Sequence, residues 1–540
     1  MVRVLIVNNI VLSLDASVDE AFSRGLKKLR SIGINSQSLK SKIYRKSIDA
    51  RRKNDIKLVY SIAFEGDFPD LSDDKLSKIN AHYEKYDEPD FIIGSVPLND
   101  RPIIVGSGPA GLFCGLLLAE NGYKPIILER GGCIADRIKA VDDFKKSRVL
   151  DVDTNIQFGA GGAGTFSDGK LITRINDPMS SYVLRRFVEF GAPEDIVYTA
   201  KPHIGTDILC KVVDLILDRI IELGGTVKYN TKFLDADFEH EKISSVKTDR
   251  GDISAGALIL AIGHSARDTY LTLLKRGLNL ESKNFSVGMR IEHPATSIDE
   301  AMYGSFAGHK ALGHAEYSLS YNTKVRGVYT FCMCPGGVVV PASSEEGGVV
   351  VNGMSYHARD GVNSNSAVVC SIFKEDFNAN PLDAIEFQRK IEKNAFISGG
   401  CDYSAPLITV GDFISGKVKT EPTVVKPTYM DGGVKLISPY DYFPAFVCDN
   451  IKNALSGFNN KISGFSSPYA LLTGPETRTS APIRILRNNT NYLALGYKNL
   501  YPIGEGAGYA GGITSASIDG VRAAITIMQQ YSPKFNPGEI

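Results

Sequence analysis

The stretch PIIVGSGPAGLFCGLLLAENGYKPIILERG, residues 102–131, constrains the fold of this chain more than any other segment. An apolar strand leads into glycines spaced G-x-G-x-x-G, a helix follows, and a second apolar strand ends in an acid. Glycines at this spacing permit a tight turn, close approach of a pyrophosphate and close helix packing, and the helix start offers free N–H groups to phosphate. We predict a Rossmann-like dinucleotide-binding unit with these contact residues: Gly106, Gly108, Pro109, Ala110, Gly111, Glu129 and Arg130.

The segment LYPIGEGAGYAGGITSA, residues 500–516, indicates which dinucleotide is bound. Here a strand, an acid and a glycine run precede a helix, and in flavoproteins with two dinucleotide sites a late strand and helix of this kind close the FAD domain. A helix N-terminus stabilises the negative charge of a reduced flavin. We expect FAD contacts from Gly263, Gly504, Glu505, Gly511, Gly512 and Ile513. No second complete glycine motif exists, so NAD(P)H is expected only as a transient electron donor.

Composition narrows the class of protein. The chain has 540 residues, 43% of them hydrophobic, with 61 basic and 61 acidic residues, as expected for a soluble protein of two or three domains. No apolar run reaches the roughly 18 residues of a membrane span. The eight cysteines lack the spacing of a disulfide framework or a metal site. We therefore expect a cytoplasmic protein with free thiols, no metal and no membrane partner.

The first 97 residues are predicted to form a separate α+β domain. Hydrophobic patterning gives the order βαββαβ, which is the ferredoxin-like pattern, with a second helix over 73–85 and a last strand over 90–94. Eleven basic residues and one acid lie between positions 24 and 53, whereas nine acids and three lysines lie between 64 and 91. The basic half could hold RNA or phosphate, but the two halves largely cancel, so we do not expect a nucleic-acid partner.

The chain resembles the FAD-dependent dehydrogenases (NAD(P)/FAD-dependent oxidoreductases) that carry an extra N-terminal α+β domain, within the glutathione-reductase-like class of flavoproteins. The motifs that carry the resemblance run nearly end to end: YRKSIDARRK, NIQFGAGGAGTFSDGKL, KPHIGTDIL, VGMRIEHP, TFCMCPGG, MSYHARDGVNSNSAVV, ETRTSAPIR and YPIGEGAGYAGGITSA. The resemblance implies FAD binding and a redox role. The expected domains are 1–97, 98–283 (first part of the FAD domain), 284–490 (β-rich, substrate side) and 491–540 (closure of the FAD domain). The Cys-x4-Cys pair of the disulfide reductases in this class is absent.

The glycine-rich loop 155–171 is expected to run along the pyrophosphate and the flavin. The candidates there are Gly161, Gly162, Ser167, Asp168, Gly169 and Lys170. Lys170 would place a cation beside the flavin; the alternative is an ion pair with Asp168. His203, before a predicted helix, is a candidate for proton transfer, or a structural histidine.

Three arginine-bearing motifs of the β-rich domain suggest an anionic substrate held through guanidinium groups. The candidate substrate-binding residues are Arg290, His293, Arg359, Asn363, Asn365 and Arg478. The alternative is that these arginines form ion pairs between domains.

Cys332 and Cys334 are read as residues of a regular strand, with both side chains on one face. In that geometry a disulfide between them is strained, since the Cα atoms are roughly 6.5 Å apart. Cys334 is expected to lie closer to the flavin. The open alternatives are redox or acid–base chemistry by either cysteine, lining of a substrate pocket, and plain packing.

We interpret the chain as an FAD-dependent enzyme that transfers a hydride between flavin N5 and a small-molecule substrate, with a further redox partner in some steps. One alternative is a flavin-dependent RNA-modifying enzyme that uses the basic N-terminal domain. Another is a non-enzymatic flavin-bound sensor or assembly protein.

Overall fold

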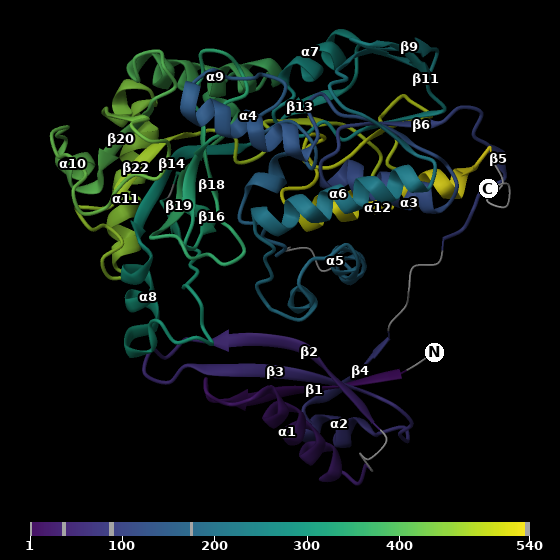
Figure 1. Cartoon of the computed structure of the whole chain (residues 1–540), viewed down its shortest axis with the longest axis vertical. Coiled ribbons are helices and arrows are strands. Elements are labelled where there is room, and N and C mark those ends of the chain that lie inside the picture. The colour runs from purple at the N-terminus through teal and green to yellow at the C-terminus, as the bar shows by residue number, and fades with distance from the viewer. Residues whose placement is uncertain (1–2, 35–38, 86–90, 173–176, 324, 535–540) are drawn as a thin grey trace.

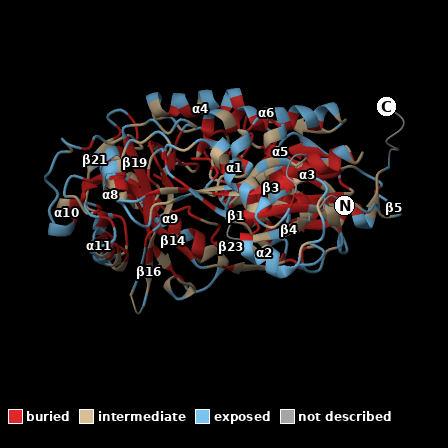
Figure 2. Cartoon of the chain, turned by 90° about the horizontal axis from the view of Figure 1, so that it is seen from below, coloured by how far each residue is buried: buried red, intermediate tan, exposed pale blue. Residues whose placement is uncertain are grey.

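The computed structural model of the chain describes residues 3–34, 39–85, 91–172, 177–323 and 325–534. A small N-terminal unit lies beneath a larger body that contains two main sheets (Figure 1). Buried residues concentrate inside the body, and the outer helices turn exposed faces to solvent (Figure 2). Within the described ranges, no helix combines the length and apolarity that crossing a membrane requires.

The N-terminal unit has two helices packed on one face of a four-stranded sheet. Its elements are β1 (Arg3–Leu12), α1 (Val18–Arg30), β2 (Lys40–Asp49), β3 (Lys57–Glu65), α2 (Asp73–Ile79) and β4 (Ala81–Lys85). The strand order is β2-β3-β1-β4, and every neighbouring pair is antiparallel. Ser17 begins α1 by accepting a hydrogen bond from the backbone N–H of Glu20, which satisfies one free donor of the first turn.

Two expectations for this unit are wrong. The second helix was predicted over 73–85, but it ends at Ile79 because Asn80 takes the left-handed conformation with φ 56°. The freed residues 81–85 then pair with β1 as the last strand. The strand predicted over 90–94 does not form at 91–94; Gly94 instead donates its N–H to the carbonyl of Met528. Residue 90 lies outside the described residues.

A five-stranded parallel sheet organises the middle and the end of the chain. Its order is β24 (Leu500–Pro502), β12 (Ala257–Leu260), β6 (Pro102–Val105), β7 (Ile126–Leu128) and β8 (Thr226–Lys228). In chain order the strands are placed 5-4-1-2-3, so the chain runs outward from β6 in both directions. This reversal opens a crevice at the carboxyl ends of β6 and β12.

Both faces of the parallel sheet are covered. Helices α3 (Pro109–Glu120), α6 (Thr206–Glu222) and α12 (Ile513–Gln530) pack on one face, through apolar residues such as Leu116, Ile216 and Ala524. On the other face lie α7 (Arg267–Lys275) and an antiparallel sheet of β9 (Phe233–Glu239), β10 (Lys242–Thr248) and β11 (Gly251–Ser254). Helices α4 (Ile134–Ser147) and α5 (Met179–Glu189) complete this part.

A seven-stranded sheet forms the other half of the body. Its order is β15 (Ser320–Asn322), β16 (Gly327–Cys334), β19 (Asn363–Ile372), β14 (Phe285–Pro294), β22 (Leu471–Glu476), β20 (Ala405–Thr409) and β21 (Val434–Leu436). Its associated helices are α8 (Ala295–Tyr303), α9 (Pro381–Ser398), α10 (Val410–Ser415) and α11 (Ala445–Asn459). The hairpin of β17 (Val338–Pro341) and β18 (Val351–Met354) faces β14, β19 and β22 from the cavity side.

Short strand pairs tie the parts of the chain together. β13 (Leu280–Ser282) pairs with β23 (Ile483–Ile485), where the chain leaves and re-enters the half that holds the parallel sheet. β5 (Val96–Pro97) pairs with β25 (Tyr531–Ser532). The N-terminal unit docks through the edge of β2: Lys46 N donates to Tyr198 O and Ala200 N donates to Lys46 O, each at 2.8 Å.

Candidate functional site

A cavity of about 510 Å³ occupies the crevice at the carboxyl ends of the parallel strands. One wall comes from the first glycine turn and the loop 157–170, and a second comes from 261–266 and the start of α12. The third wall is the end of β16 with residues 316–318, from the seven-stranded half. The volume lies within the range of small-molecule and cofactor sites.

The first glycine turn has the close packing that its spacing predicts. Gly106 has φ 100°, a conformation that disfavours side chains, and a Cβ there would lie 2.4 Å from the carbonyl oxygen of Ala261. Gly108 differs, because a Cβ on it would meet only Gly162, at 3.8 Å. The space before Gly108 therefore belongs to the cavity, beside the first free N–H groups of α3. This arrangement fits a pyrophosphate.

Glu129 lies at the cavity wall, at the end of β7. Its carboxylate accepts four hydrogen bonds, from the N–H and hydroxyl of Ser107 and from the N–H groups of Gly131 and Gly159. These bonds fix both oxygens, so Glu129 positions the glycine turn as well as facing the cavity. Arg130 also lines the cavity; its guanidinium lies 4.2 Å from the ring centre of Phe158 and donates to Asp268 at 2.9 Å.

The start of α12 closes the opposite end of the cavity. Gly263, Gly504, Glu505 and 511–513 all line it, and their contact with FAD stays a prediction. Burial raises the pKa of Glu505 to about 8, against the opposing effect of the Lys283 cation. Burial also lowers the pKa of Lys283, whose Nζ donates to Gly508 O at 2.8 Å. The sequence reading did not single out Lys283, because it lies in no recognisable motif.

The loop 155–171 divides between the cavity and the protein interior. Gly162, Ser167 and Lys170 line the cavity, whereas Gly111, Gly161, Asp168 and Gly169 are not among its lining residues. Asp168 is fully buried, and its carboxylate is held by Lys170, Ser355 and Arg359. The expectation that Asp168 contacts the cofactor is therefore wrong, because its oxygens are used within the protein. Lys170 pairs with Asp168, as the alternative reading expects, and it also lines the cavity; a place beside the flavin stays a prediction.

Most of the predicted substrate-binding residues also face inward. All five N–H donors of Arg290 are bonded within the protein, to Glu476, Asn365, Asn352 and the carbonyl of Cys332. Asn363 donates to Glu292 and to Lys426 O. None of the five residues Arg290, His293, Arg359, Asn363 and Asn365 is a lining residue of the cavity. Arg359 pairs with Asp168 across the predicted domain boundary, in line with the alternative of ion pairs between domains, whereas Arg290 pairs with Glu476 inside 284–490. Contact of these five residues with a substrate stays a prediction.

Arg359 and His293 illustrate why these side chains are unavailable. Arg359 binds Asp168 at 2.5 and 2.9 Å and Glu316 at 2.7 Å, so its guanidinium joins the glycine-rich loop to residue 316. His293 shares a hydrogen bond of 2.7 Å with Phe465 O, and burial lowers its pKa to about 4. Each side chain serves a contact that sequence spacing does not reveal.

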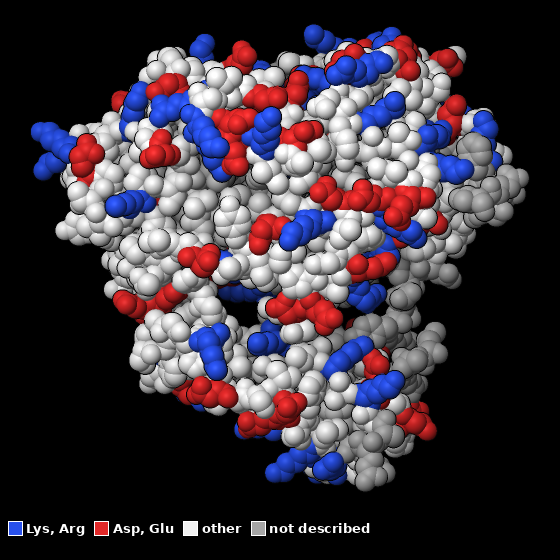
Figure 3. All heavy atoms as spheres, in the orientation of Figure 1, with Lys and Arg blue, Asp and Glu red and all other residues white. Residues whose placement is uncertain are grey.

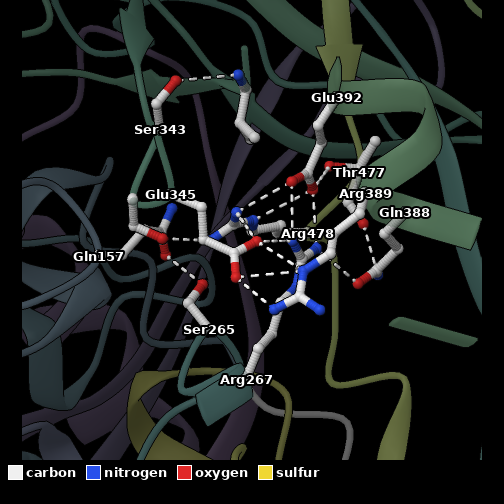
Figure 4. Close-up of polar contacts among 12 residues, drawn as sticks. Gln157, Ser265, Arg267, Ser343, Glu345, Gln388, Arg389, Glu392, Thr477 and Arg478 are labelled. Atoms are coloured by element: carbon white, nitrogen blue, oxygen red, sulfur yellow. Dashed lines mark hydrogen bonds and ion pairs between the residues drawn. The ribbon is translucent and has the colours of Figure 1, made fainter. Parts of the chain in front are cut away.

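Arg478 does line the cavity, at the end of a buried ion-pair network (Figure 4). Its Nη2 lies 3.0 Å from Glu392, which also binds Arg267 through two bonds of 2.8 Å. Glu392 comes from α9 and Arg267 from α7, so the network joins the two halves of the body. Gln388 and Thr477 complete it, and Arg267 and Arg389 both reach Glu345.

His203 lies outside the cavity wall. Its Nε2 is 3.1 Å from His357 O, its ring stacks on that of His357 with centres 5.3 Å apart, and burial lowers its pKa. His203 is not a lining residue. The expectation of direct proton transfer is therefore wrong, and the structural alternative fits these contacts.

The cysteine pair does not lie in a regular strand. Phe331 pairs with Ala367 and Cys334 pairs with Asn365, so β16 holds one extra residue, and Cys332 has φ 43°. This bulge turns Cys332 into the cavity wall and leaves Cys334 fully buried behind it. The prediction of a regular strand is therefore wrong, since the bulge separates two side chains that alternation places on one face. Cys332, and not Cys334, lines the cavity, and the position of either thiol relative to a flavin stays a prediction.

Several cavity residues had no local sequence signal. Gln157, His264, Lys201, Glu316, Asn352 and Glu476 all line the wall. Glu476 lies within the quoted motif ETRTSAPIR, but only its basic and hydroxyl residues were singled out. Burial raises the pKa of Glu476 to about 7, although the Arg290 guanidinium 2.5 Å away opposes the shift. Lys201 is the first residue of the quoted motif KPHIGTDIL but was not singled out, and Glu316 lies in a segment without a motif, so only the fold brings it to the site.

Two comparisons with known proteins bear on the family of this chain, one over part of it and one over nearly all of it. Residues 284–479 match the family described as "FAD-dependent protein, C-terminal domain-like". An uncharacterised protein from Clostridium beijerinckii is 43% identical over 529 residues, which span 97% of this chain and 98% of the relative. The chain belongs to the same family as that protein.

Solved flavoprotein structures are more distant. Glycine oxidase from Bacillus cereus is 11% identical with a TM-score of 0.35, over 80% of this chain and 99% of the oxidase. CtdE in complex with FAD is 12% identical with a TM-score of 0.31, over 79% of this chain and 84% of that protein.

Proposed function

We propose that this chain is an FAD-dependent oxidoreductase that transfers a hydride between the flavin N5 and a small-molecule substrate bound in the cavity. The observation that carries the proposal is the cavity itself. It brings the first glycine turn, the N-terminus of α12 and a wall from the seven-stranded half together around one volume. A Rossmann-like reading of the parallel sheet supports binding of a dinucleotide at this crevice.

The residues present fit FAD at both ends of the cavity. The open space before Gly108 fits the pyrophosphate, and Glu129 and Arg130 line the side where an adenosine would lie. When bound, FAD supplies the two-electron chemistry of hydride transfer. The N-terminus of α12 offers N–H groups and a positive dipole end where negative charge would develop. Lys283 adds a cation beside Glu505.

The substrate would lie against the wall that the seven-stranded half supplies. This wall includes Tyr317, the 331–333 segment, Glu476 and Arg478. Lys170 and Lys201 add cations beside Glu316. These groups support a small polar substrate, and an anionic one is favoured where Lys170, Lys201 and Arg478 line the same volume. NAD(P)H as the electron donor is part of the proposal and is tested by anaerobic reduction with NADH and NADPH.

The surface of the N-terminal unit supports a small-molecule partner over RNA. Lys42 pairs with Glu65, and Arg51 pairs with Asp49 at 2.5 Å. Over the face shown in Figure 3, Lys and Arg side chains are interspersed with Asp and Glu. Mixed charge of this kind provides no extended positive field for a nucleic acid. We propose that residues 1–97, with their ferredoxin-like strand order, serve a role other than nucleic-acid binding, in a cytoplasmic protein.

We also propose that the chain divides as 1–97, 98–283, 284–490 and 491–540. The path of the chain supports this division, because it leaves the parallel-sheet half at β13 and returns at β23 and β24.

The test is the visible spectrum of the purified protein, before and after addition of FAD, followed by titration of apoprotein. Gly108→Leu should weaken FAD binding at least about 100-fold, or roughly 2.7 kcal/mol, because its side chain would fill the space before the helix start. Gly108→Ala is the matched control, since its Cβ meets only Gly162, and it should have a much smaller effect. Tight FAD binding by Gly108→Leu, with an unchanged melting temperature, would overturn this placement of the cofactor.

A further inference from the structure

The bulge in β16 brings two thiols together at the cavity wall. In a regular strand, residues two apart lie near the upper Cα distance for a disulfide. Here the extra residue between Phe331 and Cys334, and the left-handed backbone of Cys332, take the segment out of that extended geometry. The Cys334 thiol donates to the carbonyl oxygen of Cys332 at 3.4 Å. A non-glycine residue in this conformation is strained, and such strain is found at functional sites.

The two thiols are placed unequally. Cys332 is partly exposed and lines the cavity, whereas Cys334 does not line it. Cys334 is fully buried directly behind it. A front thiol at the cavity wall and a back thiol behind it are the two parts of a dithiol exchange site.

A buried guanidinium adjoins the pair. Arg290 donates to the Cys332 carbonyl at 2.7 Å, and its Nη1 lies 3.9 Å from the Cys334 Sγ. The hydrogen bond from the Cys334 thiol, with the Arg290 and Lys170 cations, lowers the pKa of Cys332 to about 6 against the effect of burial. The pKa of Cys334 is raised, because the pair holds one proton and the second is hard to remove. The front thiol is thus the nucleophile of the pair.

Other buried thiols of the chain lack this environment. Burial raises the pKa of Cys114, Cys210, Cys370 and Cys448. Cys401 is exposed but lies outside the cavity wall. The combination of a cavity-lining cysteine, a neighbouring thiol and a buried cation therefore distinguishes residues 332–334 among these cysteines.

We propose that Cys332 and Cys334 form a thiol–disulfide exchange site for a small-molecule disulfide that enters the cavity. The Cys332 thiolate attacks one sulfur of the disulfide, the S–S bond of that molecule breaks, and its first thiolate leaves. Cys334 then attacks the Cys332 sulfur as its own proton passes to the departed thiolate. The second thiolate leaves, and the bond Cys332–Cys334 forms. The two protein sulfurs lose two electrons and the small disulfide gains them. One of its halves is released as a thiol and the other as a thiolate, which takes a proton from water.

The exchange uses the same cavity as the proposed oxidoreductase function but needs no bound FAD for its electron balance. Return of electrons between the dithiol and a flavin rests on the proposed function. The two can fail separately, because flavin absorbance reports FAD and the mass of a peptide reports the disulfide.

The test uses oxidised glutathione as the probe on the protein as purified. After exposure, free thiols are blocked with iodoacetamide under denaturing conditions, and the protein is digested with trypsin. The peptide 327–359 follows Arg326, has no internal Lys or Arg, and contains Cys332 and Cys334 as its cysteines. In the unaltered protein it should lose two hydrogen atoms and take up no blocking group.

The variants separate the two roles. Cys334→Ser should retain one glutathione on residue 332, because the second attack is removed. Cys332→Ser should take up no glutathione in this peptide, because Cys334 is buried. Cys401→Ser is the matched control and should behave like the unaltered protein, while Cys401 itself should react in the other variants and show that the probe is active.

Two results would overturn the exchange site. One is a peptide 327–359 that stays fully reduced while Cys401 is modified. The other is a Cys332→Ser variant whose Cys334 reacts as fast as the unaltered pair. Flavin absorbance and melting temperature, recorded for each variant, identify a variant that fails only because it misfolds; for such a variant, the corresponding alanine substitution repeats the comparison. If the protein binds FAD but forms no Cys332–Cys334 disulfide, only the exchange site is refuted. If it forms the disulfide but binds no FAD, only the oxidoreductase proposal is refuted.

Discussion

Glu392 lies between two buried arginines, and its removal tests what holds the halves of the body together. The carboxylate binds Arg267 at 2.8 and 2.8 Å and Arg478 at 3.0 and 3.2 Å, and it also accepts from Thr477 at 2.6 Å. Glu392→Gln removes the fully buried carboxylate that binds both guanidinium groups and leaves them with the partly exposed Glu345, 2.5 Å from Arg267 and 3.8 Å from Arg478 (Figure 4). Breaking a buried pair in this way costs about 3–5 kcal/mol.

The assay is differential scanning calorimetry of the apoprotein, since a chain of several domains does not unfold in two states. For a cooperative unit of 150–250 residues, a loss of this size lowers the melting temperature by roughly 6–20 °C. Glu386→Gln is the matched control: its partner Arg389 lies 2.6 Å away at the surface, and an exposed pair contributes under about 1 kcal/mol.

The pH dependence has a definite sign. Although burial alone would raise the pKa of Glu392, Arg267 and Arg478 hold it well below its usual range. Its ionisation therefore contributes stability that is fully present above the unfolded pKa near 4.5 and is lost as the pH falls below it. The difference in melting temperature between Glu392→Gln and the unaltered protein should be largest at pH 7 and should decrease below pH 4.5. A shift of less than 2 °C at pH 7 would refute the reasoning.

Two further predictions concern the cavity. Burial raises the pKa of Glu505 to about 8, so the stability of the apoprotein should fall as the pH rises from the unfolded pKa to pH 8. Glu505→Gln should have a higher melting temperature than the unaltered apoprotein at pH 9 and the same melting temperature at pH 4. Equal melting temperatures at both pH values would contradict this. Arg290→Met removes the buried cation beside Cys332. The Cys332 thiol also faces Lys170, Asp168, Cys334 and Glu476. Alkylation of Cys332 by iodoacetamide at pH 5, below the pKa of about 6, should slow by about tenfold, which is the effect of one pKa unit on the thiolate fraction. Cys401 in the same sample should react at an unchanged rate, and an unchanged rate at Cys332 would remove Arg290 from the account of that thiol.

The parts that the sequence predicts well are those in which a short stretch decides the geometry. The spacing of Gly106, Gly108 and Gly111 requires one kind of turn, and the structure has it at the carboxyl end of β6, the central strand of the parallel sheet. The glycine run before α12 faces the cavity for the same local reason.

The contacts that the sequence does not predict depend on partners far along the chain. Asp168 and Arg359 meet across 191 positions, and Arg290 and Glu476 meet across 186. Residue type indicated charge at these positions, but only the fold decides whether a charge meets a substrate or another side chain. At Cys332 a single extra residue in β16 separates two side chains that strand alternation places on one face, because side chains alternate with a period of two.

The pairing of α3 with α12 has a consequence for the order in which the molecule is assembled. Helix α3 is buried almost all round, and at Gly520 of α12 a Cβ would lie 2.1 Å from the carbonyl oxygen of Ala110. During synthesis on a ribosome the parallel sheet therefore cannot be completed until residues 500–530 have been made. Until then one face of α3 is uncovered and β12 lacks its neighbour β24. The seven-stranded half, whose strands all lie between residues 285 and 476, can form before that point. The crevice that holds the cavity is consequently the last part of the body to form. A chain that stops short of α12 has an exposed apolar helix and an open sheet edge, and both features promote aggregation.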